Sequence, residues 1–314
     1  MPREALVLLV ALAADAAFGD PPSRWHPVAW CGHVIGWGQH RWAYGSRARL
    51  RLWGAVLVVG LALAAGIVAW TLDSLTARFG LAAVLVQGLI LKTTLSVRVL
   101  VARALEVAAH LEDGRLAAAR VAVGHHLVSR PTRELDHGHV ASAAIESVAE
   151  NLTDSLVAPL VFFLVFGLPG AVAYRVVNTA DAMLGYREGV LEDFGKVAAR
   201  FDDALNFIPA RLAAVILALS ACVVGQTGPA FRVMWRDHAL TASPNAGWTM
   251  AAMAGVLGVT LEKMGAYRLG GGLLPTTRDI SRSVKIFYTA SGLTTLLAVL
   301  VILLAAGLPR AGTN

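Results

Sequence analysis

The sequence predicts an all-α, polytopic integral membrane protein with about 4–7 transmembrane or re-entrant helices and cytoplasmic helical segments. Of its 314 residues, 56% are hydrophobic and only 15% are charged, whereas a soluble domain has roughly 25% charged residues. The hydrophobic residues gather in long stretches, as they do in membrane-spanning helices. The two cysteines are far apart and form no disulfide framework or metal-binding set. We expect one membrane-embedded domain over residues 1–314.

Seven apolar stretches are candidates for helices: 5–18, 52–72, 81–91, 156–177, 212–225, 246–259 and 287–308. Only 52–72, 156–177 and 287–308 reach the roughly 20 residues that a span needs. The shorter stretches predict short spans, re-entrant segments or buried helices. Gly167-Leu168-Pro169-Gly170 interrupts the 156–177 stretch. It predicts either a kink or the turn of a hairpin that returns the chain to its starting side.

The basic residues predict the orientation of the chain in the membrane. The Arg-rich segments 19–51 and 96–150 are expected on the cytoplasmic side, which places 73–80 outside. The side of 178–211 stays open. The net charge of +6 suits cytoplasmic flanks and anionic ligands equally, and the scattered Arg residues argue against a nucleic-acid partner. The N-terminus has an alternative interpretation as a secretory signal peptide, but Asp15 within its apolar segment favours a retained helix.

The strongest site signal is an acidic face beside a long apolar stretch. Glu146, Glu150 and Asp154 are spaced at i, i+4 and i+8, which is one face of a helix. Three carboxylates on one face repel each other unless a cation lies among them. Holding them at a bilayer boundary adds the cost of their lost solvation. The pattern indicates a divalent metal with a phosphate-bearing substrate. The alternative is a buried cluster paired with Arg residues of another helix.

Polar residues also gather before and after that face. Asp20 and His26 follow the first apolar stretch in Gly19-Asp20-Pro21 and His26-Pro27-Val28, where a simple turn is the alternative. Arg175, Asn178 and Asp181 are three residues apart and share a helical face. An ordinary helix end at the membrane interface explains them equally well.

Two further segments carry amides and carboxylates. Asp202 and Asp203 either cap the helix that begins near Pro209 or bind magnesium. Asn245 precedes a helix rich in small residues and is a candidate to hold a phosphate or carboxylate together with loop amides.

In this order, these clusters resemble the membrane-bound adenosylcobinamide-phosphate synthase (cobinamide synthase) family of cobalamin biosynthesis. The resemblance covers roughly residues 10 to 290 and rests on these segments: Gly19-Asp20-Pro21 with His26-Pro27-Val28, Glu146-Ser147-Val148-Ala149-Glu150-Asn151 with Asp154, Asn178-Thr179-Ala180-Asp181-Ala182-Met183-Leu184-Gly185-Tyr186, Asp203-Ala204-Leu205-Asn206-Phe207-Ile208-Pro209-Ala210-Arg211, and Ser243-Pro244-Asn245-Ala246-Gly247. The chain departs from the family at Thr249-Met250, where Pro-Glu is frequent, and at 261–264. An acidic role at position 250 is therefore either missing or carried by Glu262.

The resemblance implies an ATP-dependent amide ligase that joins a propionate side chain of adenosylcobyric acid to aminopropanol or its O-phosphate, with ATP and Mg²⁺ as cofactors. It implies the bacterial cytoplasmic (inner) membrane, an active site on the cytoplasmic side, and other cobalamin-biosynthesis enzymes as candidate partners. Phosphoryl transfer depends on positioning and metal-neutralised oxygens rather than on a protein nucleophile.

The resemblance also implies roles for individual residues. Glu146, Glu150 and Asp154 are expected to hold magnesium with the ATP phosphates, and Asp181 and Asp203 to complete the metal shell or orient the amine. The expected substrate-binding residues are Asp20, His26, Asn151, Arg175, Asn178, Tyr186, Asn206, Arg211 and Asn245. Three alternatives remain at this point: a transporter, a catalytically silent protein of the same fold, and a phosphotransferase acting on lipid alcohols. The last lacks its expected Asp-Gly and Ala-Arg repeats.

Overall fold

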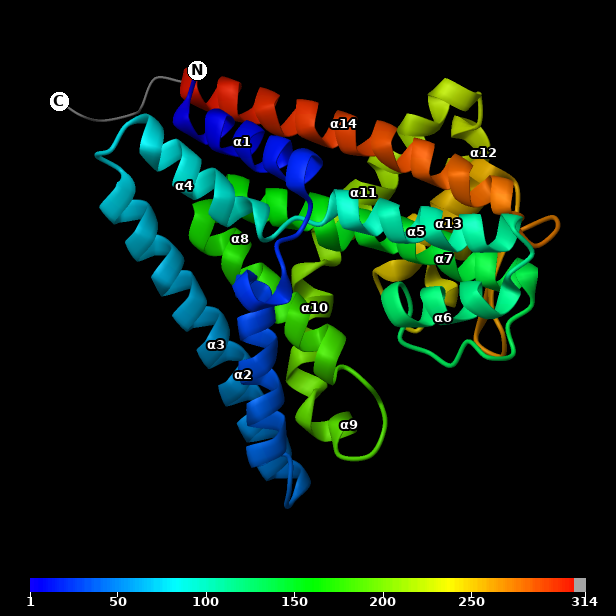
Figure 1. Cartoon of the computed structure of the whole chain (residues 1–314), viewed down its shortest axis with the longest axis horizontal. Coiled ribbons are helices and arrows are strands. Elements are labelled where there is room, and N and C mark those ends of the chain that lie inside the picture. Colours follow the sequence, from blue (N-terminus) through cyan, green and yellow to red (C-terminus); the bar gives the residue numbers. More distant parts are fainter. Residues whose placement is uncertain (308–314) are drawn as a thin grey trace. The chain divides into compact units, whose positions relative to one another are not determined.

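The computed structural model describes residues 1–307 and is built almost entirely from helices (Figure 1). Five helical segments within these residues are long and apolar enough to cross a membrane: Arg47–Thr76, Leu81–Glu112, His137–Leu184, Phe207–Val224 and Thr277–Gly307. The predicted fold class is therefore confirmed. The seven apolar stretches fall on helical segments, except that residues 225, 258 and 259 lie just past a helix end and position 308 lies outside the described residues.

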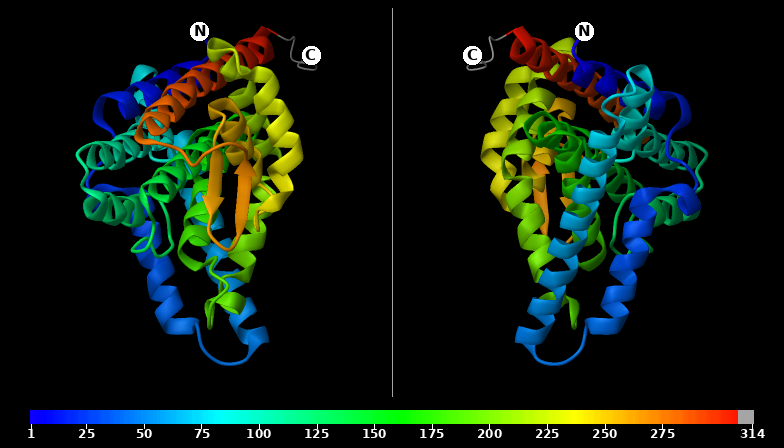
Figure 2. Two further views of the ribbon diagram at one scale, coloured as in Figure 1. Left: turned by 90° about the vertical axis from the view of Figure 1, so that its right-hand side faces the viewer. Right: turned by 90° about the vertical axis from the view of Figure 1, so that its left-hand side faces the viewer.

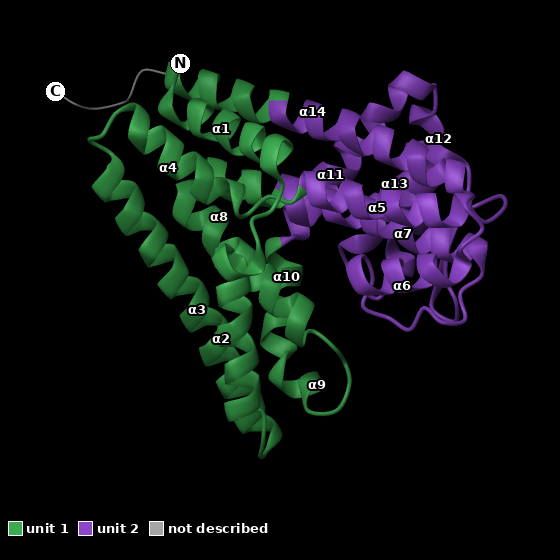
Figure 3. Ribbon diagram, viewed as in Figure 1, with its two compact units in different colours: residues 1–96, 158–205, 296–314 green, residues 97–157, 206–295 purple. Residues whose placement is uncertain are grey.

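The chain divides into two compact units, each assembled from separate stretches of sequence (Figure 3). Unit 1 contains 1–96, 158–205 and the chain from 296 onward, and unit 2 contains 97–157 and 206–295. The last helix, α14 (Thr277–Gly307), begins in unit 2 and ends in unit 1. The prediction that residues 1–314 act as a single domain stays a prediction.

Unit 1 is a bundle of helices whose bounds are α1 (Arg3–Phe18), α2 (Pro27–Trp42), α3 (Arg47–Thr76), α4 (Leu81–Lys92), α8 (Ala158–Leu184), α9 (Leu191–Phe194) and α10 (Lys196–Leu205), with a 3-10 turn η1 (Ser23–Trp25) before α2. α1 packs along α4, and α3 packs along α8. Small residues permit the closest approaches: a Cβ added at Gly54 of α3 would lie 1.9 Å from the Phe194 carbonyl oxygen. Its core includes Ile35, Val58 and Phe194, all fully buried.

Unit 2 contains α5 (Val97–Glu112), α6 (Leu116–His126), α7 (His137–Leu152), a π-helical turn η2 (Thr153–Val157), α11 (Phe207–Ser220), a 3-10 turn η3 (Ala221–Val224), α12 (Thr227–Asp237), a 3-10 turn η4 (His238–Leu240), α13 (Ala246–Leu257) and the first part of α14. α7 begins where the Asp136 carboxylate accepts a hydrogen bond from the His139 backbone N–H at 2.9 Å, which caps the helix. α13 is buried from Gly247 to Leu257, and most of its residues are small or apolar.

The sequence did not predict the two short strands of unit 2. β1 (Thr260–Lys263) and β2 (Tyr267–Gly270) pair antiparallel, with Lys263 opposite Tyr267 (Figure 2). The three-residue loop between them contains Gly265 at φ 71°, which is the conformation that such hairpins require and glycine adopts without strain. β1 packs against α7, so this hairpin brings its side chains to the acidic helix.

α8 consists of two arms that fold back on each other. The backbone leaves the helical region at Gly167, where φ is 67° and ψ is −161°. Phe162 and Tyr174 are 12 positions apart, roughly 18 Å along a straight helix, yet their rings stack with centroids 5.0 Å apart. The chain therefore bends sharply at Gly167, so the predicted interruption of this segment is confirmed, while the choice between a kink and a hairpin that returns to the starting side stays a prediction.

Replacing Gly167 with alanine is expected to destabilise this turn by about 1–3 kcal/mol, because its φ and ψ lie in a region that is open essentially only to glycine. Thermal unfolding of the purified protein in detergent measures the change. Gly60→Ala is the matched control, since Gly60 lies within α3 with nothing close to the added Cβ. Equal melting temperatures for both variants would contradict the proposed strain.

Candidate functional site

The sequence-predicted site residues fall into separate sets in the two units. Unit 2 carries Glu146, Glu150, Asn151, Asp154, Asn206, Arg211 and Asn245, and unit 1 carries Asp20, His26, Arg175, Asn178, Asp181, Tyr186 and Asp203.

Glu146 is buried in α7, and both oxygens of its carboxylate accept hydrogen bonds from nearby side chains. Its carboxylate is only 4% exposed and accepts hydrogen bonds from Arg130 at 3.0 Å, the Ser142 hydroxyl at 2.7 Å and the Tyr267 hydroxyl at 2.8 Å. Arg130 supplies the balancing positive charge and lies in the loop before α7. Of the two interpretations of this residue, the arrangement is that of the salt-bridged cluster, although the partner comes from a loop rather than another helix.

Tyr267 and Ser142 tie the β-hairpin to this carboxylate. Burial, reinforced by the negative charge of Glu146, raises the pKa of Tyr267 far above its usual range, so the phenol remains a hydrogen-bond donor. The Ser142 hydroxyl donates to Glu146 and accepts from the backbone N–H of Glu262 at 2.8 Å. The Met250 sulfur lies 3.9 Å from the Tyr267 hydroxyl, so the position at which the sequence departs from the family lies beside this cluster.

Glu262 also reaches the N-terminal end of α7. Its carboxylate lies 3.3 Å from the Arg268 guanidinium and 3.9 Å from Nε2 of His139. His139 pairs through its other ring nitrogen with Asp136 at 2.8 Å. Glu262 therefore lies close to the acidic helix, as a substitute for an acidic residue at 250 requires.

Beyond Glu150 the predicted acidic face meets the π-helical turn. α7 ends at Leu152 and Asp154 lies in the wider turn at Thr153–Val157, so the regular i, i+4 spacing does not continue past Glu150. Glu150 and Asp154 are both half-buried. Asp154 accepts a hydrogen bond from the Asn206 side-chain amide at 3.2 Å, which brings two predicted site residues together.

The amide groups of unit 2 have defined partners. Asn151 donates to the Ser147 carbonyl at 3.0 Å and accepts from the Ser155 hydroxyl at 3.2 Å, which braces the helix across the π turn. Asn245 accepts a hydrogen bond from the Arg211 guanidinium at 3.1 Å. The same guanidinium lies 4.9 Å from the centre of the Trp248 ring, a cation–π distance, so Trp248 orients a cation that is predicted to bind phosphate.

In unit 1, α8 and α10 bring three polar residues together. The Arg175 guanidinium donates to the Asn178 carbonyl oxygen at 3.1 Å, and the Asn178 amide donates to Asp202 at 3.3 Å. Asp202 and Asp203 lie in the last turns of α10, and α11 begins only at Phe207. The expectation that one of these aspartates caps the next helix is therefore wrong, because α10 ends between them and that helix.

Asp181, Tyr186 and Asp203 lie at the end of this pair of helices. α8 ends at Leu184, and a Cβ at Gly185 would lie 2.2 Å from a carboxylate oxygen of Asp181. Tyr186 and Asp203 line a cavity of about 270 Å³ together with the basic side chains of Arg187, Lys196 and Arg200. The structure thus places two predicted residues at one charged cavity.

The Asp20 motif surrounds a buried lysine that the sequence analysis missed. The Lys92 side chain is 6% exposed and pairs with Asp20 and, at 3.3 Å, with Asp15. The Nε2 atom of His26 lies 3.7 Å from the Asp20 carboxylate, and the Ser96 hydroxyl donates a hydrogen bond to that carboxylate at 3.1 Å. Burial raises the pKa of Asp20, but His26 and Lys92 outweigh it and hold the pKa well below its usual range. A lysine directly after an apolar stretch was the available signal.

Asp20 predicts a specific pH dependence of stability. Its folded pKa is depressed, so its contribution is complete above the unfolded value of about 3.9 and is lost as the pH falls toward the folded value. Wild type is expected to melt higher than Asp20→Asn at pH 6, and the difference to shrink below about pH 4. Melting curves in detergent measure it, with the exposed Asp113→Asn as the control. A constant difference between wild type and Asp20→Asn would contradict the pairing.

No group of three or more His, Cys, Asp or Glu side chains within residues 1–307 is arranged to hold a metal ion. The oxygens of Glu146 already accept hydrogen bonds from Arg130, Ser142 and Tyr267. Glu150 and Asp154 offer the oxygen donors that magnesium prefers. The assignment of Glu146, Glu150 and Asp154 to a metal stays a prediction.

Comparison with known proteins decides the family. The chain matches the family described as "CobD/Cbib protein" over residues 8–301. The chain belongs to the CobD/CbiB family. Curated relatives of the chain are named cobalamin biosynthesis proteins. The resemblance to the adenosylcobinamide-phosphate synthase family is therefore confirmed as a family assignment.

Curated relatives support the assignment along the whole chain. "Cobalamin biosynthesis protein CobD" of Dehalococcoides mccartyi is 44% identical over 304 residues, covering 96% of this chain and 98% of that protein. "Probable cobalamin biosynthesis protein CobD" of Methanothermobacter thermautotrophicus is 40% identical, covering 85% and 87%. The Chromobacterium violaceum "Cobalamin biosynthesis protein CobD" is 42% identical, covering 90% and 92%. No solved structure matches. This CobD/CbiB protein therefore has a role in cobalamin biosynthesis.

Proposed function

We propose that this CobD/CbiB protein is an ATP-dependent amide ligase. It joins a propionate side chain of adenosylcobyric acid to the amine of aminopropanol or its O-phosphate and yields adenosylcobinamide or its phosphate. The observation that carries the proposal is the gathering of carboxylates, amides and a cation in unit 2, on a chain that matches its family over residues 8–301.

Unit 2 supplies the side chains that a phosphate-bearing nucleotide needs. Glu150 and Asp154 would hold Mg²⁺, and Asn206 orients Asp154 through its amide. Arg211 is a phosphate-binding cation whose direction is set by Asn245 and Trp248. When bound, ATP with magnesium supplies the activation of the propionate carboxylate, which is otherwise a poor acyl donor.

Glu146 has a positioning role in this proposal. Its charge is balanced by Arg130, and its hydrogen bonds to Ser142 and Tyr267 join α7 to the β-hairpin. A buried, fully bonded carboxylate one turn before Glu150 keeps that helix in one register. The unit 1 residues Asp181, Asp203, Asn178 and Arg175 are proposed to bind the amine or phosphate. We place the protein in the bacterial cytoplasmic membrane with the unit 2 residues Glu150, Asp154 and Arg211 on the cytoplasmic side.

Coupling of ATP consumption to both substrates tests the proposal against transport. Detergent solution has no compartments, so transport cannot be observed there. A ligase is expected to consume ATP only when adenosylcobyric acid and the amine are both present. We expect the conversion of ATP to its product nucleotide to require adenosylcobyric acid, the amine and magnesium together. ATP consumption that ignores the amine, or none with either amine from folded protein, would favour the transporter or a catalytically silent protein.

A further inference from the structure

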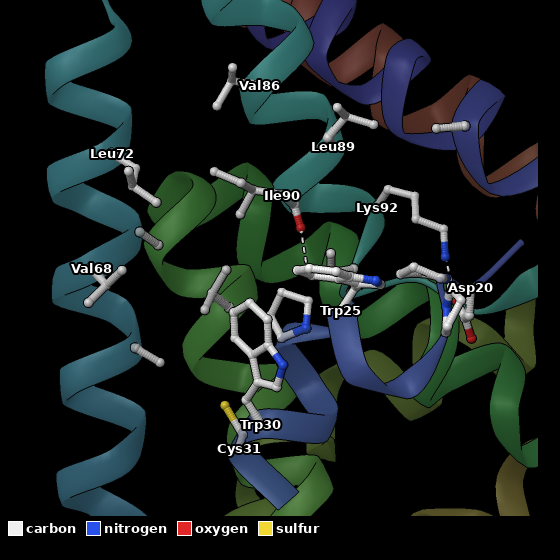
Figure 4. Close-up of a pocket in the computed structure, with 18 of the residues that line it drawn as sticks. Asp20, Trp25, Trp30, Cys31, Val68, Leu72, Val86, Leu89, Ile90 and Lys92 are labelled. Atoms are coloured by element: carbon white, nitrogen blue, oxygen red, sulfur yellow. Dashed lines mark hydrogen bonds and ion pairs between the residues drawn. The ribbon is translucent and has the colours of Figure 1, made fainter. Parts of the chain in front are cut away.

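Unit 1 contains a large apolar groove to which the proposed reaction assigns no ligand, although the predicted substrate-binding residue Asp20 belongs to its lining. It encloses about 950 Å³, at the upper end of the roughly 300–1,000 Å³ typical of small-molecule sites. One wall is α3 with Val68 and Leu72, and another is α4 with Leu89 and Ile90 (Figure 4). Trp25 and Trp30 lie between these walls (Figure 4). Its lining is almost wholly apolar, apart from the Asp20–Lys92 pair.

The walls of the groove belong to segments that are long and apolar enough to cross a membrane. α3 and α4 lie in two of the candidate spans, and Val68 and Leu89 are 58% and 54% exposed. Trp25 and Trp30 are 65% and 51% exposed, and exposed tryptophans are enriched where the hydrocarbon core meets the head groups. With α3 and α4 spanning a bilayer, the groove would face lipid and its exposed tryptophans would suit the interface.

A cation lies beside the tryptophans. The Trp30 indole N–H donates to the Arg24 carbonyl at 2.9 Å, which anchors the turn η1 against α2. The exposed Arg24 guanidinium lies 5.8 Å from the centre of the Trp25 ring. Arginine pairs readily with phosphate oxygens, so the tryptophan end of the groove is complementary to an anionic head group.

We propose that this groove holds a phospholipid of the surrounding bilayer, with an acyl chain between α3 and α4 and its phosphate at Arg24. The lipid is retained by the protein rather than exchanged as bulk solvent, because its chain contacts several helices of unit 1 at once. The inference does not depend on the proposed ligase activity.

The two cysteines of the chain provide the test. Cys31 lines the groove, whereas Cys222 is exposed and lies outside it. The full chain, purified in detergent and stripped of lipid, is labelled with N-ethylmaleimide with and without added phosphatidylglycerol, and each cysteine is followed by peptide mass spectrometry. At a lipid concentration ten times the dissociation constant, Cys31 labelling is expected to slow about tenfold, and Cys222 labelling to stay unchanged. Equal rates at Cys31 with and without lipid would overturn the proposal.

Variants separate the groove from a general effect of lipid. Ala64 lines the groove and Leu63 beside it does not, so Ala64→Phe fills the site and Leu63→Phe is the control. We expect Ala64→Phe to lose the lipid protection of Cys31 and the phospholipid that copurifies, and Leu63→Phe to keep both. Arg24→Gln should weaken protection by phosphatidylglycerol. Full protection in Ala64→Phe overturns the acyl-chain site, and full protection in Arg24→Gln overturns the phosphate contact.

Discussion

Alanine in place of Asp154 or Glu150 is expected to abolish amide formation while the protein remains inserted and folded. Both carboxylates are half-buried at the end of α7 and the π turn, where Asn206 holds Asp154 in place. Loss of one preorganised charged group at a reacting centre typically lowers kcat by about 10²–10³-fold. Loss of a ligand for the metal adds to that effect.

The conservative variant Asp154→Asn separates charge from shape. It keeps a side chain of the same size that still hydrogen-bonds with Asn206, but it cannot neutralise a cation. We expect it to be as inactive as Asp154→Ala, with an unchanged melting temperature. Glu112→Ala, at the exposed end of α5, is the control. Full activity in both Asp154→Ala and Glu150→Ala would rule out the proposed metal site.

Replacing Lys92 with methionine is expected to destabilise unit 1 by about 3–5 kcal/mol, because the buried Asp15 and the half-buried Asp20 would lose their shared cation. Methionine keeps the length of the side chain, so the loss reports the charge rather than a cavity. Thermal unfolding in detergent measures the change.

Lys285→Met is the control for this substitution, because Lys285 is exposed on α14. Adding Asp20→Asn to Lys92→Met should restore part of the stability, since one of the two uncompensated carboxylates is removed. If Lys92→Met and Lys285→Met have the same melting temperature, the ion pairs of Lys92 do not stabilise unit 1.

The apolar helices of this protein were predictable because each depends on local sequence, whereas α2 and α12 lie outside the predicted apolar stretches. The seven apolar stretches lie on helical segments apart from residues at their ends, and the helix breaks at Gly167 within the predicted interruption. Composition and hydrophobic periodicity are properties of short sequence segments, so they predict helices without knowledge of the tertiary fold.

The partners of the site residues were not predictable, because they come from distant parts of the chain. Tyr267 reaches Glu146 across 121 positions, and Lys92 reaches Asp20 across 72. The π turn at Thr153–Val157 also escaped prediction, since tertiary packing rather than local propensity decides such a turn. The sequence therefore located the acidic residues, and the fold divided them between a buried ion pair at Glu146 and half-buried carboxylates at Glu150 and Asp154.

The most direct test of the proposed ligase is its product. The full chain, purified in detergent, is incubated with adenosylcobyric acid, aminopropanol phosphate, ATP and Mg²⁺, and the corrinoid is analysed by mass spectrometry, with free aminopropanol in a parallel reaction. We expect a corrinoid heavier by the added amine minus water, formed only when ATP and Mg²⁺ are both present. No heavier corrinoid with either amine, from protein shown to be folded, would contradict the assignment of ligase activity.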